Sequence, residues 1–151
     1  MKTERHSIGK HVSLLHRQKL VFINNALKDT DITSAEYVFL AFLCYQDDGM
    51  NQKDISRELF IDKAATSRAL KSLESKGYLN REKDQLDKRI NRINITEKTR
   101  GICSRLYNTL DEWDYFISEG IDDETLELVY NTLKKMSYRS AEVQRKYLNI
   151  D

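Results

Sequence analysis

The sequence predicts a mainly α-helical fold with a small two- or three-stranded antiparallel β-hairpin. The 151 residues include no proline and five glycines, a composition typical of helices joined by short connections. Apolar residues recur at intervals of three and four along most of the chain, as they do on one face of an α-helix. Within one basic stretch, Ile93 and Ile95 alternate with polar residues, which favours a short β-ribbon.

The net charge of +1 hides an uneven distribution of charge along the chain. Residues 51–100 carry 13 basic and 8 acidic side chains, whereas residues 101–133 carry one basic and eight acidic side chains. A basic centre beside an acidic segment indicates one face that meets a polyanion and another that avoids it.

The sequence gives no indication of export or membrane insertion. The first 20 residues are too charged to form the apolar core of a signal peptide. The longest apolar run, residues 37–45, is shorter than the ~20 residues needed to span a membrane. We therefore expect a cytoplasmic protein.

Cys44 and Cys103 fall on apolar helix faces, so we expect free cysteines packed as small hydrophobes and no disulfide framework.

Two helices are expected before the basic centre. Residues 8–28 carry an apolar stripe with helical spacing. Thr33 and Glu36 then form a capping box that starts a second helix. Its residues 37–45 are apolar nearly all round, which predicts a helix sandwiched at the centre of the domain.

Two further helices are expected after the basic centre. Thr96 is the predicted N-cap of a long helix that ends near Ser118, and Asp122 is the predicted N-cap of the last helix. These flanking helices add more apolar surface than one small lobe covers, which favours pairing of two copies. The alternative is that the terminal helices fold back on the core of their own chain.

Residues 51–77 predict two short helices joined by a tight turn. Asn51 and Asp62 are good N-caps, Phe60-Ile61 forms the turn, and Gly77 suits a left-handed residue after the second helix. The second helix has four positions with the spacing of a buried face: Thr66, Ala69, Leu70 and Leu73.

The opposite face of this second helix is small, polar and cationic. Its residues are Lys63, Ala64, Ala65, Ser67, Arg68 and Lys71. Small side chains at the start of a helix allow its backbone to approach a base pair closely, and the planar fork of Arg68 matches guanine O6 and N7. A helix-turn-helix presents its second helix to the major groove in this way. The alternative is an ordinary amphipathic helix with a solvated basic face.

The hairpin that follows favours DNA binding over that alternative. Residues 83–91 form a polar tip too long for a two-residue turn. Such a tip can reach a minor groove, where Arg89 would be attracted by the negative potential. Asp87 lies two residues before Arg89 and is placed to brace its guanidinium with a bidentate ion pair. The competing interpretation is a surface hairpin with incidental charges.

Together these features resemble a MarR-type winged-helix transcriptional regulator over nearly the whole chain. The matching blocks are Ile32–Tyr37, Asn51–Ile55, Ile61–Arg68, Leu73–Leu79, Asp84–Arg89 and Ile95–Lys98. The chain departs from the family pattern at Phe60 and Thr99, where many relatives have glycine.

The resemblance implies a winged helix-turn-helix with N- and C-terminal dimerisation helices. Residues 1–31 and 97–151 would form the dimer, and residues 32–96 would form the DNA-binding lobe. We expect a homodimeric repressor that binds double-stranded DNA at a pseudo-palindromic operator. The predicted DNA-binding residues are Lys53, Lys63, Ala64, Ala65, Ser67, Arg68, Lys71, Asp87, Lys88 and Arg89. The alternative function is a protein-interaction module whose basic face binds an acidic partner.

The resemblance also implies a pocket for a small aromatic or amphipathic effector between the lobe and the dimer helices. By position, the candidate lining residues are His11, Arg17, Tyr37, Tyr45 and Tyr107, although core packing is the more ordinary role for each. No enzymatic motif or cofactor-binding loop is present in the sequence. His6, His11 and His16 are spaced by five residues, which turns their rings apart on a helix and disfavours a metal site.

Overall fold

The computed structural model describes residues 7–46 and 49–148, with side chains described as far as Val143. His6, one of the three spaced histidines, lies outside these residues. The chain divides into two compact units, one ending at Trp113 and the other beginning at Asp114. The assignment of residues 1–31 and 97–151 to dimerisation remains a prediction.

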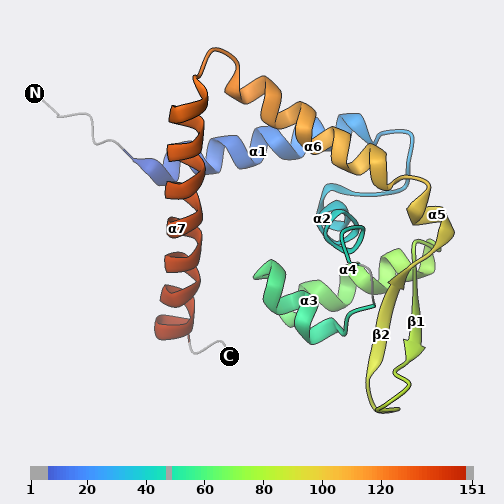
Figure 1. The fold of residues 1–151 in the computed structure, drawn as a ribbon. Coiled ribbons are helices and arrows are strands. Elements are labelled where there is room, and N and C mark those ends of the chain that lie inside the picture. The colour runs from blue at the N-terminus through green and yellow to red at the C-terminus, as the bar shows by residue number, and fades with distance from the viewer. Residues whose placement is uncertain (1–6, 47–48, 149–151) are drawn as a thin grey trace, which may run out of the picture. The chain divides into compact units, whose positions relative to one another are not determined.

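The first unit contains most of the secondary structure, labelled in Figure 1. Its order is α1 (Ile8–Ala26), α2 (Ser34–Leu43), α3 (Gln52–Leu59), α4 (Lys63–Ser75), β1 (Leu79–Lys83), β2 (Asn91–Ile95), α5 (Glu97–Arg100) and the beginning of α6 (Cys103–Ser118). The second unit holds the end of α6 and the long helix α7 (Asp123–Leu148). The predicted mainly α-helical fold with an antiparallel hairpin is confirmed.

The hairpin has two strands and one additional bridge. β1 and β2 are antiparallel, with Leu79 opposite Ile95 and Lys83 opposite Asn91. Met50, just before α3, adds a single bridge to Ile93 on β2. This bridge attaches the hairpin to the helix-turn-helix, because Met50 and Ile93 exchange two backbone hydrogen bonds of 3.2 and 2.8 Å.

Helix α2 lies at the centre of the first unit, as its apolar sequence predicts (Figure 1). It packs against α1, α4 and β2. Leu40 on α2 is fully buried, together with Ile55, Leu70, Leu73 and Leu106 from three other helices. Burial of each such side chain contributes roughly 1.5–3 kcal/mol relative to exposure. Apolar packing therefore places α4 against α2, and α3 against α4 and β2.

A buried polar network also joins α2 to α4. The Glu36 carboxylate, 5% exposed, accepts hydrogen bonds from Lys76 Nζ at 2.7 and 2.8 Å and from the Ser72 hydroxyl. It also accepts the Thr33 backbone N–H, which completes the predicted capping box. Burial raises the pKa of Glu36, but the hydrogen bonds from Lys76, Ser72 and Thr33 outweigh it, so the pKa is lowered overall.

Thr96 occupies the N-cap position of α5, but its side chain makes no capping hydrogen bond. Its hydroxyl donates instead to Gly77 O, at 2.7 Å, which ties the end of the hairpin to the end of α4. The single long helix expected from Thr96 to Ser118 is also wrong, because the chain forms α5, a short turn and then α6. Gly101 falls in that turn, where its poor helix propensity favours the interruption.

The expectation of free cysteines is wrong. Cys44, the C-cap of α2, and Cys103, the first residue of α6, form a disulfide with their Cα atoms 5.8 Å apart. Each cysteine lies on an apolar face, as expected, but the two faces meet at the junction of these helices. Fifty-nine positions separate the pair in sequence. Local spacing therefore carries no signal for the bond.

No helix in the described part of the chain combines the length and the apolar character needed to cross a membrane.

Candidate nucleic-acid interface

Helix α4 buries one face and leaves its cationic face in solvent. Thr66, Leu70 and Leu73 are buried. Lys63, Ala64, Arg68 and Lys71 are exposed, while Ala65 and Ser67 are half-buried beside them. Within residues 7–46 and 49–143, Lys63, Arg68 and Lys71 form no ion pair or side-chain hydrogen bond. Their charges are therefore not neutralised by those neighbours.

The entry to α4 is held by local hydrogen bonds. Asp62 accepts the Ala65 backbone N–H at 2.8 Å and acts as the predicted N-cap. Phe60 occupies the left-handed region, with φ 53° and ψ 37°, at the position where many relatives have glycine. This conformation is rare for a bulky residue. The Ser56 hydroxyl donates to Ile61 O at 2.6 Å and closes the turn. The turn thus forms without glycine.

We call β1, β2 and the connecting tip, residues 84–90, the wing. Within the wing, Leu79 on β1 and Ile93 on β2 are buried, whereas the Arg89 side chain at the tip is 91% exposed. The Arg89 guanidinium donates to both Asp87 carboxylate oxygens, each at 3.1 Å, as the sequence predicts. This contact lowers the pKa of Asp87. Lys88, between them in sequence, is exposed.

Asp84 is a wing residue that was absent from the predicted site. Its side chain is buried, and Oδ1 accepts the backbone N–H groups of Leu86 at 2.8 Å and Asp87 at 2.9 Å. The second oxygen, Oδ2, accepts from Arg92 Nε. The backbone hydrogen bond from Asp87 lowers the pKa of Asp84 most, followed by the side-chain hydrogen bond from Arg92 and the backbone hydrogen bond from Leu86, and the resulting pKa is about 2. Aspartate that accepts backbone hydrogen bonds two and three residues ahead is typical of turns, and this was the available signal.

Lys53 is exposed on α3. The structure therefore places the cationic members of the predicted set in solvent on α3, α4 and the wing tip: Lys53, Lys63, Arg68, Lys71, Lys88 and Arg89. Their contacts with DNA remain a prediction.

The five predicted effector residues do not gather around one described cavity. His11 and Arg17 are exposed on α1, and Tyr37 is buried in α2. Tyr45 and Tyr107 meet, with ring centroids 4.2 Å apart. Desolvation by burial raises the pKa of the Tyr107 phenol, and the neighbouring Tyr45 raises it further.

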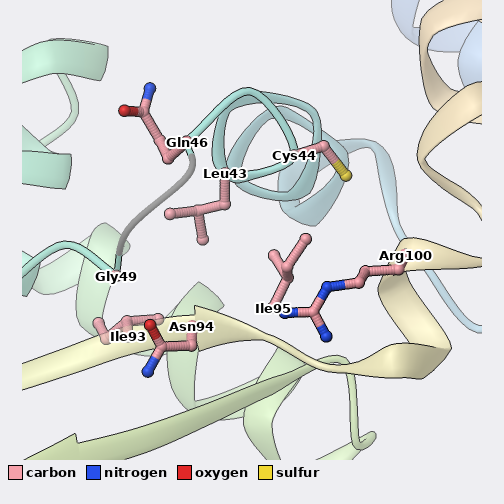
Figure 2. A pocket seen from close by; sticks show the side chains of 8 residues that line it. All are labelled: Leu43, Cys44, Gln46, Gly49, Ile93, Asn94, Ile95 and Arg100. Atoms are coloured by element: carbon pink, nitrogen blue, oxygen red, sulfur yellow. The ribbon is translucent and has the colours of Figure 1, made fainter.

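A hollow of about 280 Å³ lies elsewhere, between the end of α2, β2 and α5. Figure 2 shows the Arg100 side chain extending beside Ile95 in this hollow. Its lining residues are Leu43, Cys44, Gln46, Gly49, Ile93, Asn94, Ile95 and Arg100. None of the five predicted effector residues is among them, so effector binding by those five remains a prediction.

Comparison with known proteins agrees with this geometry. A model of the MarR family matches residues 30–90. A MarR transcriptional regulator from Methanosarcina mazei Go1 is 32% identical, covering 90% of this chain and 97% of its own, with a TM-score of 0.81. CouR from Rhodococcus jostii RHA1, solved bound to p-coumaroyl-CoA, is 25% identical, with coverage of 91% and 96% and a TM-score of 0.80.

A Listeria monocytogenes protein described as a MarR family regulator was solved in complex with a 26mer DNA. It is 20% identical, with coverage of 93% and 94% and a TM-score of 0.86, and this likeness shows a shared fold. The Methanosarcina relative is similar enough over nearly the whole of both chains to establish the family. This chain belongs to the MarR family, whose members are transcriptional regulators and not enzymes.

Proposed function

We propose that the chain is a homodimeric repressor that binds a pseudo-palindromic operator and is released from it by a small-molecule effector. The observation that carries the proposal is the solvent-facing cationic surface of α4, beside a wing whose tip presents Arg89. The Listeria relative solved with a 26mer DNA supports the same use of the fold.

Each predicted residue has a distinct role on DNA. Arg68 reads a guanine edge in the major groove through two hydrogen bonds from its planar fork. Lys63 and Ser67 lie within reach of the same groove, and the small Ala64 and Ala65 let the helix approach it. Lys53, Lys71 and Lys88 contact phosphates, which adds affinity without sequence preference. Arg89, braced by Asp87, enters the adjacent minor groove.

Apolar side chains on the flanking helices support the dimer. On α1, Ile8, Val12 and Leu15 are between 45% and 58% exposed in the single chain. On α7, the apolar residues Val129, Leu133 and Met136 follow one another at helical spacing. An exposed apolar stripe on a helix, as each of these two helices carries, usually marks an interface, and twofold pairing is the commonest arrangement. Two copies of α4 would then meet DNA about one turn, roughly 34 Å, apart.

Effector control is supported by CouR, the relative solved with p-coumaroyl-CoA. The aromatic contact between Tyr45 and Tyr107, two of the five proposed lining residues, is consistent with this proposal. A ligand weakens DNA binding only to the extent that it prefers the conformation of the dimer that cannot bind DNA. A small aromatic or amphipathic compound is the chemical class we expect.

The proposal is tested by fluorescence anisotropy with the duplex that flanks the chain's own gene. Scrambled duplex is the comparison, and both are measured at two salt concentrations. We expect tighter binding to the genomic duplex and a steep dependence on salt, because phosphate contacts release counterions. Equal, salt-insensitive binding to both duplexes would instead favour the module that binds an acidic protein.

Arg68→Ala and Arg57→Ala provide a matched pair of variants. Both remove an arginine from the helix-turn-helix, but the Arg57 guanidinium is already paired with Asp54 at 2.9 Å and with Glu58 at 3.3 Å. We expect the larger loss of affinity and of sequence preference for Arg68→Ala. Equal effects of the two variants would contradict base reading by Arg68.

A further inference from the structure

A continuous set of polar contacts runs from the loop before α3 to the wing tip. It begins at Gly49 O, which accepts a hydrogen bond from Arg92 Nη1 at 2.7 Å. Arg92 Nε donates to the Asp84 carboxylate. Asp84 accepts the Asp87 backbone N–H, and the Asp87 carboxylate holds the Arg89 guanidinium. We call these five residues the wing relay.

The loop end of the relay is a close backbone contact. A Cβ added at Gly49 would lie 1.9 Å from Asn94 Oδ1 and 3.1 Å from Ile93 O, so a larger residue would require the Asn94 side chain to move and the Ile93 carbonyl to shift by a few tenths of an ångström. The neighbouring Met50 exchanges two backbone hydrogen bonds with Ile93. Arg92 therefore starts from a backbone carbonyl whose position relative to β2 is well defined.

The tip end of the relay is the wing turn itself. Asp84 is 6% exposed, and one carboxylate oxygen organises the turn by accepting from Leu86 and Asp87 while the other faces Arg92. Asp87 Oδ1 also accepts the backbone N–H of Arg89, at 3.0 Å. The turn thus fixes both the backbone and the side chain of Arg89, although that side chain is nearly fully exposed.

We propose that Asp84 and Arg92 are positioning residues that set the presentation of Arg89 to DNA. They need not touch DNA for this role. Asp84 holds the tip in the conformation that places Asp87 under the Arg89 guanidinium, and Arg92 anchors Asp84 to the Gly49 loop. A pre-ordered arginine loses less conformational freedom on binding, and the affinity is correspondingly higher. This inference rests on the proposed DNA-binding function.

Two substitutions separate positioning from simple charge. Asp84→Asn removes a negative charge beside the wing, so electrostatics alone predicts tighter binding to DNA. The relay predicts weaker binding, because the amide group cannot both keep the two backbone contacts and accept from Arg92 Nε. Arg92→Lys keeps the charge, so electrostatics alone predicts no change. The relay predicts weaker binding, since one ammonium replaces a fork that uses two nitrogens.

The decisive measurement is a double-mutant cycle on operator affinity. The assay is fluorescence anisotropy with the full-length chain and the genomic duplex. We expect Arg89→Ala to weaken binding by about tenfold, the low end for loss of a specific arginine contact. Asp84→Asn and Arg92→Lys should each weaken it by about fivefold in the parent chain and by less than twofold in the Arg89→Ala background.

A second cycle with Arg68→Ala serves as the control. Arg68 lies on α4, outside the relay, so each relay substitution should retain its full fivefold effect in that background. Thermal unfolding of every variant identifies any that fails to fold. Arg92→Lys, which alters a half-exposed side chain, tests the proposal if Asp84→Asn does not fold.

The relay would be overturned if Arg92→Lys bound the operator as tightly as the parent chain or more tightly. It would also be overturned if the affinity losses of Asp84→Asn and Arg92→Lys were as large in the Arg89→Ala background as in the parent chain. Failure of the parent chain to prefer its genomic duplex would instead overturn the proposed function, and the two outcomes are thereby distinguished.

Discussion

Reduction of the Cys44–Cys103 disulfide should lower the stability of the first compact unit. The bond joins the end of α2 to the start of α6 and closes a loop with a sequence separation of 59 residues. In the chain-entropy model, closing a loop of this length lowers the conformational entropy of the unfolded chain by about 14 cal/mol/K. This corresponds to a stabilisation of about 4 kcal/mol at 25 °C. We therefore expect a loss of stability of this order when the bond is reduced.

Urea unfolding followed by circular dichroism, with and without dithiothreitol, measures this loss. At a typical slope of about 2 kcal/mol per M urea, the midpoint should fall by about 2 M on reduction. Protein concentration must be held fixed, because association stabilises the folded state by mass action. Cys44→Ala/Cys103→Ala is the control and should unfold at the same midpoint with or without reductant.

Equal midpoints for the oxidised and reduced parent chain would refute the reasoning. Titration of free thiols in the oxidised folded protein is a separate check on the bond. Two reactive thiols per chain would show that the bond does not form. No reactive thiol, together with equal midpoints, would show that the bond forms but does not stabilise the fold through the entropy of the unfolded chain.

Three further predictions concern stability and DNA affinity. Glu36→Gln should destabilise the fold by roughly 2–3 kcal/mol in urea unfolding, below the full cost of breaking a buried ion pair because the Lys76 side chain remains 24% exposed. Because the folded-state pKa of Glu36 is lowered, its ionised form stabilises the fold above its ordinary pKa, and this contribution is lost as pH falls through the folded-state value. The loss of urea midpoint between pH 7 and pH 3 should therefore be smaller in Glu36→Gln than in the parent chain, and an equal loss would contradict the assignment. Arg68→Ala should cost about 1–3 kcal/mol on the specific duplex and relax sequence preference, whereas Lys71→Ala should weaken binding to all duplexes alike and reduce the salt slope by about 1. Both variants are measured by anisotropy titration on specific and random duplex. An equal loss of affinity by both variants on both duplexes would contradict these roles.

The features predicted correctly from sequence are those decided within a few residues. Asp62 caps α4 through a backbone N–H three residues ahead, and Gly77 has φ +79° immediately after the same helix. Asp87 reaches Arg89 two residues away. Each of these features depends on residues that are close together in sequence, so residue type and spacing are sufficient to predict it.

The features that sequence reasoning missed depend on how distant elements dock. Cys44 meets Cys103 only because α2 ends where α6 begins. The Thr96 hydroxyl bonds Gly77 O, 19 positions earlier, and is thereby removed from its expected role as a helix cap. Arg92 reaches Gly49 O across 43 positions. Helical periodicity identifies the faces that pack together, but it does not specify which polar groups become neighbours once they have packed.

The two arginines of the proposed interface are consequently supported in different ways. Arg68 projects from a helix anchored by fully buried Leu70 and Leu73, so its position follows from apolar packing that the whole lobe shares. Arg89 projects from a two-stranded hairpin, and such hairpins are marginally stable by themselves. Its position therefore depends on hydrogen bonds at the tip and on the anchor to the Gly49 loop. Sequence reasoning identified both arginines and the packing beneath Arg68. It also predicted the Asp87 brace of Arg89. It missed the anchor of the tip through Asp84 and Arg92 to Gly49, because hydrogen bonds between distant residues are specified by individual atoms and not by a repeating pattern.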